Sequence, residues 1–344
     1  MLRITLAALT ALGVAPLGSA RPQAGAPSPA PPPAALFDAA DPLAITLTAD
    51  FNAIAKERGE QKHPHPGVLS YVTPRGDSVS LKVNLHTRGH YRLRICSFPP
   101  LKVEFDKNES AHTLFAHQGN LKLVVQCRDN RASANYLIEE YLIYRVFNLV
   151  TQMSFKARLA RVTYVDATAR RPPETRYGFF LENDDRMARR NHAQVEALKG
   201  VIQSQTDPAQ MGLVTVFEYL IANTDFSVAG LHNIVLIKDS AHVYFAVPYD
   251  FDWSGVISPP YAIPDSRLGL RTVRDRLYRG YCRTPEELAP YLAAFNAVKD
   301  SIYALYRGQE GLEQGRVEEA LKYYDEFYRT INDPRRVKRA FIDS

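Results

Sequence analysis

Four side chains that could bind a metal through oxygen lie in one short stretch of the 344-residue chain: Asp225, Asn233, Asp250 and Asp252. Carboxylate and amide oxygens are the ligands that Mg²⁺ and Mn²⁺ prefer in proteins. Phosphoryl transfer from a nucleotide needs such a set, because one Asp orients the acceptor hydroxyl while other oxygen ligands hold the metal on the phosphates. The stretch therefore predicts a nucleotide–metal site. Asp225 would be the catalytic residue, and Asn233, Asp250 and Asp252 would be the metal ligands.

The elements around these side chains are predicted to bring them together. Residues 206–222 have helical apolar periodicity and end at the loop with Asp225. Residues 234–237 and 243–247 are short apolar strands separated by an Asp-Ser turn, which predicts a hairpin. The loop with Asp and Asn precedes this hairpin and the Asp-Phe-Asp segment follows it, so the two loops should meet. The alternative is that these residues only form turns, because Asp and Asn side chains readily bond the local backbone.

The order of these segments resembles the CotH-type (spore-coat) family of atypical kinases. In that family an Asp-bearing loop with a downstream Asn precedes a Pro-aromatic-Asp-aromatic/apolar-Asp segment that ends near a Gly, as residues 248–255 do here. The resemblance covers roughly residues 80–260 and includes residues 87–89, 99–105 and 177–182. The chain departs from eukaryotic kinases because it has no Gly-x-Gly-x-x-Gly loop and no His-Arg-Asp triplet. Its loop Asp and Asn are also eight residues apart, a wider spacing than in those kinases.

The resemblance implies an α+β, two-lobed protein-kinase-like fold. An antiparallel-sheet front lobe would span about residues 67–182, and a mostly helical back lobe about residues 183–344. The whole kinase-like domain would then cover residues 37–344.

A cation in the front half is expected to contact the nucleotide phosphates. Residues 136–150 are apolar on nearly every side, which predicts a buried helix. Buried carboxylates need partners, so Glu139 or Glu140 should meet a cation. The resemblance implies that Lys102, or else Lys122, contacts the phosphates and that Glu140, slightly favoured over Glu139, holds this lysine. The alternative is that both lysines point to solvent from half-buried strands.

Two further residues are candidate nucleotide ligands. Arg88 precedes Gly89, and such a pair could bind phosphate in place of the missing Gly-rich loop, because Gly allows close approach and Arg binds phosphate through two bonds. The alternative for this pair is a turn beside an exposed Arg. Glu182 follows the strand 177–181, and the resemblance places it next to the hinge where the adenine ring would lie.

The first residues predict export. A positive start, an apolar stretch that reaches Leu17 and small residues up to Ala20 are typical of a secretory signal peptide at residues 1–20. Residues 21–36 are rich in Pro and Ala and predict an extended linker. The apolar stretch is short for a membrane span, so cleavage would leave no stable span and a periplasmic or extracellular protein. An uncleaved anchor is the alternative.

Charge and cysteines set further expectations. The net charge is +5, but the basic residues are dispersed and do not interleave with aromatics, so we expect no nucleic-acid partner. The chain has three cysteines. Cys96 and Cys127 flank the same predicted sheet region and are the preferred pair if a disulfide forms after export, which would leave Cys282 free. The sequence alone does not fix this connectivity.

These observations lead to the prediction of an exported, metal-dependent atypical kinase. It would use ATP with Mg²⁺ or Mn²⁺ and transfer the γ-phosphate to a hydroxyl, which we expect to lie on a protein. Two other classes stay open. One is a catalytically inactive kinase-like scaffold or envelope assembly protein, and the other is a metal-dependent phosphoester hydrolase that uses the same carboxylates. The residues do not specify the acceptor, the transferred group or the oligomeric state.

Overall fold

The computed structural model describes residues 36–59 and 61–343. The predicted signal peptide, and all but the last residue of the predicted linker, lie outside this part of the chain. Within it, no helix combines the length and the apolar character needed to cross a bilayer.

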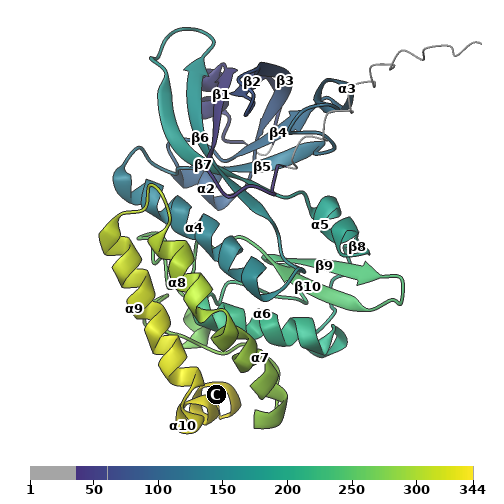
Figure 1. Cartoon of the computed structure of the whole chain (residues 1–344), viewed down its shortest axis with the longest axis vertical. Helices are drawn as coiled ribbons and strands as arrows, with labels where there is room; N and C mark the ends of the chain where they lie inside the picture. Colours follow the sequence, from purple (N-terminus) through teal and green to yellow (C-terminus); the bar gives the residue numbers. More distant parts are fainter. Residues whose placement is uncertain (1–35, 60, 344) are drawn as a thin grey trace, which may run out of the picture. The chain divides into compact units, whose positions relative to one another are not determined.

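Seven strands close into a barrel in the order β1-β2-β3-β4-β5-β7-β6 (Figure 1). Their bounds are Leu43–Ala49 (β1), His65–Val72 (β2), Ser78–Thr87 (β3), Leu101–Phe105 (β4), Asn120–Val125 (β5), Ala157–Asp166 (β6) and Glu174–Leu181 (β7). Neighbouring strands of the barrel are antiparallel, except for β1 and β6, which pair in parallel. The barrel has its own hydrophobic core, because alternate side chains of each strand point inward.

The prediction of a two-lobed protein-kinase-like fold with an antiparallel-sheet front lobe is therefore wrong. Strand β1 lies before residue 67, where that lobe was expected to begin, and its parallel pairing with β6 closes the sheet. Ile45 is paired with Val162, more than one hundred residues away in the chain. The sequence reasoning missed this closure because a local alternation of apolar residues does not reveal which distant strand will be the partner.

Apolar and polar residues alternate along β3, and burial follows this alternation. Leu81, Val83 and Leu85 are buried, whereas Lys82 and Asn84 are exposed. The expected disulfide is also present, because Cys96 and Cys127 are bonded, and Cys282 is free and exposed.

Helices and a second sheet make up most of the rest of the described chain. The helices are α1 (Phe51–Lys56), α2 (Tyr91–Ile95), α3 (Lys107–Ser110), α4 (Arg131–Val150), α5 (Asp184–Arg190), α6 (Pro208–Ile221), α7 (Pro285–Ala297), α8 (Lys299–Arg307), α9 (Gln314–Ile331) and α10 (Pro334–Val337). The sheet has the order β10-β9-β8, with β8 at Ala193–Glu196, β9 at Ile234–Asp239 and β10 at Tyr244–Pro248. The part expected to be mostly helical thus contains a three-stranded sheet.

Helix α4 connects the barrel to the other helices. It begins at Asn130, whose side chain accepts a hydrogen bond from the backbone N–H of Ser133. It then packs against β6 and β7 on one side and against α6 and α8 on the other (Figure 1). The predicted buried helix is therefore confirmed, and its all-round apolar surface is explained by having neighbours on both sides.

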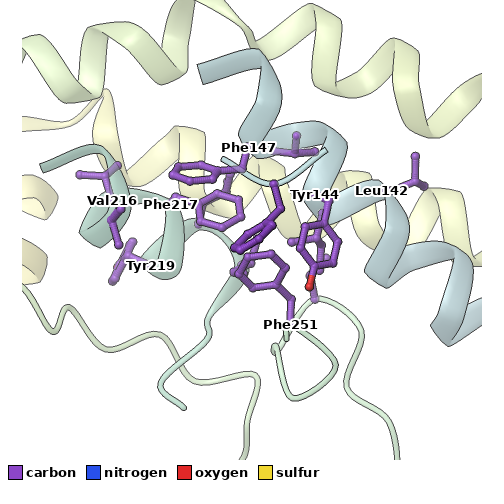
Figure 2. Close-up of a cluster of buried hydrophobic side chains, with 14 of the residues drawn as sticks. Leu142, Tyr144, Phe147, Val216, Phe217, Tyr219 and Phe251 are labelled. Atoms are coloured by element: carbon purple, nitrogen blue, oxygen red, sulfur yellow. The ribbon is translucent and has the colours of Figure 1, made fainter. Parts of the chain in front are cut away.

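A row of aromatic rings joins α4 to the loop after β10 (Figure 2). Phe147 of α4 stacks on Phe217 of α6 with ring centroids 4.3 Å apart. Phe251 packs edge-on against Phe217 at 5.3 Å and lies 4.7 Å from the ring of Tyr144. Aromatic pairs of this kind add to the stabilisation from burial alone. They fix Phe251 in place, and with it the two carboxylates on either side of it.

Candidate functional site

Asp225 lies on the loop after α6 and is held by two side chains of that loop. The Asn233 Nδ2 group donates to the Asp225 carbonyl at 2.7 Å and to its Oδ2 at 3.0 Å. His232 Nε2 lies 2.9 Å from Asp225 Oδ1. The Asp225 side chain is still 39% exposed. Its carboxylate is therefore fixed in direction yet accessible to an acceptor group from solvent.

The β9–β10 hairpin joins this loop to the loop with Asp250, as the sequence predicted. Ile234 is paired with Pro248, and the backbone N–H of Tyr249 donates to the Asn233 carbonyl at 3.0 Å. Asn233 has φ 51° and Asp250 has φ 64°, both in the left-handed region. Asn and Asp tolerate this conformation better than most residues because their short polar side chains can bond the local backbone.

Asp250 and Asp252 stand on either side of the anchored Phe251. The backbone N–H of Asp250 donates to the Tyr144 hydroxyl of α4 at 2.9 Å. The Asp250 carboxylate itself has no hydrogen bond or ion pair with residues 36–59 or 61–343. Asp252 is buried, and its Oδ2 accepts a hydrogen bond from the Tyr261 hydroxyl at 3.1 Å. The two carboxylates thus differ: that of Asp250 is available, and that of Asp252 is already bonded.

Like charges are concentrated around Asp252. Burial and then the neighbouring Asp250 carboxylate raise the pKa of Asp252 to about 7, with a smaller contribution from Asp225. Burial also raises the pKa of Glu140 on α4, and the charges of Asp252 and Asp250 add to this. The four acidic groups are therefore close enough to interact electrostatically, although they come from three separate segments of the chain.

Two arginines from the barrel side balance part of this negative charge. Arg88 follows β3 and donates from Nε to the Leu101 carbonyl at 3.2 Å. Burial lowers the pKa of Arg88, and the nearby Asp250 carboxylate opposes this change. Arg92 of α2 donates to the Val125 carbonyl at 2.7 Å, and its Nη1 lies 3.6 Å from Glu140 Oε2. The charges of Arg88 and Asp250 are therefore close enough to interact.

The expected pairing of a strand lysine with Glu140 is not present. Glu140 pairs with Arg92 instead. Lys102 is half-buried on β4, and its side chain makes no ion pair within the described part of the chain. Lys122, the second candidate, contacts the residue before Asp250: its Nζ is 4.7 Å from the ring centroid of Tyr249, and it also lies 2.9 Å from Asp184 Oδ1.

The two remaining candidate glutamates, Glu182 and Glu139, have roles inside the fold. Glu182 is buried and accepts from Arg190 Nε at 3.1 Å and Nη2 at 2.8 Å, and also from the Lys156 backbone N–H. Its carboxylate is thus occupied, and the structure does not bring it to the Asp loops. Glu139 binds the Arg316 guanidinium of α9 at 2.8 Å. The expectation that the buried helix glutamates meet cations is confirmed, but by arginines.

Arg92, Tyr144 and Tyr261 are site residues that the sequence reasoning missed. Arg92 lies in a short helix whose neighbours carry no motif, and its partner Glu140 is far away in the chain. Tyr144 is one of several aromatics in an apolar helix, and Tyr261 lies in an irregular loop. The one available signal was the buried Glu140, which required a cation without identifying it.

The donor set suits a magnesium–nucleotide complex better than a bare metal ion. Among the described residues, no three His, Cys, Asp or Glu side chains form a group that could enclose a metal. Mg²⁺ does not require such a group, because it keeps several waters and is held by one or two carboxylates together with substrate phosphates. The available Asp250 carboxylate, with Arg88 nearby for the phosphates, fits this mode of binding.

Glu218, on the helix that leads into the Asp225 loop, has a buried carboxyl group whose protonation can be tested. It lies near the end of α6, and within the described chain both its carboxylate oxygens are buried without a hydrogen-bond partner. Burial, with a contribution from Asp225, raises the pKa of Glu218 to about 8, against 4.5 for an ordinary Glu. The folded protein therefore keeps this group neutral at pH 7.

The pH dependence of stability follows from this neutral carboxyl group. Between pH 4.5 and about 8 the folded state binds the proton and the unfolded state releases it, so stability falls as pH rises. Glu218→Gln has no such proton. As pH rises through this window, the wild type should therefore lose free energy of unfolding relative to Glu218→Gln, by up to about 1.4 kcal/mol per pH unit. Urea unfolding of both proteins at pH 5 and pH 8 measures this change. The same difference in free energy of unfolding between variant and wild type at both pH values would contradict a neutral Glu218.

Comparisons with known proteins add little to this picture. No protein-family model matches the sequence, and no curated protein matches it. Among solved structures, the chain is similar to the crystal structure of a Helicobacter pylori proinflammatory kinase, CtkA, with 11% sequence identity and a TM-score of 0.39. The match covers 71% of this chain and 91% of that one. A likeness this weak does not establish a shared fold or activity, so function has to be argued from the site itself.

Proposed function

We propose that this chain is a metal-dependent phosphotransferase that moves the γ-phosphoryl group of ATP to an acceptor hydroxyl. The observation that supports this most is the junction of the two Asp loops at Asn233 and Tyr249. A fixed, accessible Asp225 and an available Asp250 carboxylate lie on these adjoining loops, and the charge of Arg88 acts on Asp250. Phosphoryl transfer needs these parts and little covalent chemistry from the protein.

The roles follow from the bonds each side chain already makes. Asp225 would orient the acceptor hydroxyl and accept its proton, since Asn233 and His232 hold its carboxylate in one direction. Asp250, with Asn233 and Asp252, would hold Mg²⁺ or Mn²⁺. The bound metal would supply positive charge against the phosphate oxygens. Arg88, with Lys122 rather than Lys102, would neutralise the remaining phosphate charge.

The wider predictions are part of this proposal. They are the resemblance to the CotH-type family, export to the periplasm or beyond, a protein as the acceptor and the absence of a nucleic-acid partner. An inactive nucleotide-binding scaffold is the second candidate, and one observation favours it. Glu140 pairs with Arg92 and not with a strand lysine, so the lysine–glutamate pair that positions the nucleotide phosphates in protein kinases is not formed.

Metal-dependent stabilisation by ATP tests the proposed site. A ligand that binds only the folded state at one hundred times its Kd stabilises that state by about 2.7 kcal/mol. We expect the melting temperature of the full chain to rise with ATP and Mg²⁺ or Mn²⁺, to rise less with ATP and EDTA, and not to rise for Asp250→Ala. Asp300→Ala, which removes an exposed Asp from α8, is the matched control and should behave as the wild type.

The result separates the three classes of function. A metal-dependent shift with transfer of phosphate to a hydroxyl supports the phosphotransferase. The same shift without turnover supports the scaffold, and release of inorganic phosphate without any acceptor supports a hydrolase. The absence of any shift for the wild type would reject a nucleotide site.

A further inference from the structure

A polar cavity of about 280 Å³ has a lining that includes no residue of the Asp loops. It is bounded by the first described residues, by the C-terminal half of α4 and by the segment that leads into β6. The charged side chains that line it are Arg145, Lys156, Arg190 and Asp38. None of the residues assigned to nucleotide or metal binding lines this cavity, so the proposed function leaves it unexplained.

Positive charge exceeds negative charge in this cavity. Arg190 is compensated, because its guanidinium binds the buried Glu182. Lys156 Nζ lies 3.6 Å from Asp38 Oδ1, but the Asp38 side chain is 56% exposed, so solvent weakens this pair. Arg145 is the cation without a carboxylate: within residues 36–59 and 61–343 its one hydrogen bond is from Nη1 to the Tyr141 hydroxyl, at 2.7 Å.

The geometry of Arg145 favours an oxyanion as the missing partner. The Tyr141 hydroxyl is one turn back on α4, so this bond fixes the guanidinium at the cavity and leaves its other N–H donors unused. Arg presents its donors in a planar fork that matches phosphate and carboxylate oxygens. Arg158, whose charge acts on Arg145, is itself paired with Asp41 at 3.2 Å, so Arg145 stays the cation that lacks a carboxylate among the described residues.

We propose that this cavity is a binding site for a phosphate group, with Arg145 and Lys156 as its ligands. The cavity has more room than one phosphate ion requires, so the group could be free phosphate or the phosphate of a small monoester. The proposal is independent of the proposed function, because none of the residues that line the cavity is assigned to nucleotide or metal binding.

Thermal-shift titration of the full chain with sodium phosphate is the test, with sodium chloride at equal ionic strength as the reference. We expect a saturable rise in melting temperature for the wild type. The rise should be lost in Arg145→Gln and should need at least about tenfold more phosphate in Lys156→Gln, since a charged hydrogen bond contributes about 1.5–3 kcal/mol. Arg161→Gln is the matched control, because Arg161 is a half-exposed arginine of β6 paired with Glu310.

Two further arms complete the design. Titration with glycerol phosphate in place of phosphate shows which kind of ligand the cavity prefers. Tighter binding of the ester indicates a small organic phosphate, and tighter binding of the ion indicates free phosphate. Asp250→Ala should keep the phosphate response, which separates this cavity from the nucleotide site. The proposal is overturned if the wild type shows no saturable response, or if Arg145→Gln and Lys156→Gln both respond as the wild type does.

Discussion

Asp225→Asn should lower the rate of phosphoryl transfer by about 10²–10⁴-fold, the usual contribution of a general base. The Asn side chain has the size of Asp. Its one oxygen can keep the hydrogen bond from Asn233 Nδ2, and its NH2 group can donate to His232 Nε2 in the tautomer that accepts. It cannot take up the proton of an acceptor hydroxyl. Nucleotide binding should therefore survive while turnover is lost. The measurement is ADP release from ATP and Mg²⁺ in the presence of a mixture of Ser-, Thr- and Tyr-containing peptides.

The control for this prediction is Asp239→Asn in the turn of the β9–β10 hairpin. Asp239 is another Asp with a hydrogen-bonded carboxylate, at the other end of the same hairpin, where its Oδ1 accepts from the backbone N–H groups of Ala241 and Val243. It should keep the wild-type rate. If Asp225→Asn also keeps that rate, Asp225 braces the loop and does not act on the acceptor, and the scaffold becomes the better description.

Phe251→Ala should destabilise the fold by about 3–5 kcal/mol, as expected for removing a fully buried Phe. Its ring contacts Phe217 and Tyr144, so the cavity left behind opens the row of aromatics in Figure 2. Phe295→Ala, which removes an equally buried ring from α7, should destabilise to a similar extent. Urea unfolding followed by circular dichroism measures both.

The two substitutions should differ in their effect on the site. Phe251 lies between Asp250 and Asp252, so its loss should abolish ATP-dependent stabilisation, whereas Phe295→Ala should retain it. If either Ala variant fails to fold, Phe251→Leu and Phe295→Leu give the same comparison with a smaller loss of stability. Trp253, the chain's one tryptophan, lies with its ring centroid 5.7 Å from that of Tyr91, and its fluorescence reports binding nearby. Equal ATP responses in the two Leu variants would contradict a positioning role for Phe251.

Local patterns predicted the parts of the site that neighbours in the chain determine. The hairpin at residues 234–248 follows from two apolar strands and a turn, and it brings Asn233 and Tyr249 into contact. The Cys96–Cys127 bond is the pair that the sequence favoured, because both cysteines flank one predicted sheet region. The catalytic and metal-binding roles of Asp225 and Asp250 stay predictions, because geometry alone does not test them.

Partners that lie far apart in the chain could not be predicted in the same way. The pairing of Arg92 with Glu140, and the bonds of Glu182 to Arg190, depend on how whole elements pack. A buried carboxylate requires some cation, but several lysines and arginines in this sequence meet that requirement equally well. The closure of the barrel was missed for the same reason: the residues of β1 do not identify β6 as the strand with which it pairs.

The parallel pair of β1 and β6 also has a consequence for how the chain reaches its native state. Ile45 can pair with Val162 only after the more than one hundred residues between them have been synthesised and arranged, so the barrel cannot close before then. Contacts at such sequence separation carry a large loop-closure cost and slow folding. Until then β1 presents an unpaired edge, which could pair with the same strand of another molecule. Closure of this seam should therefore be a late event in folding, and misassembly at β1 the main competing reaction.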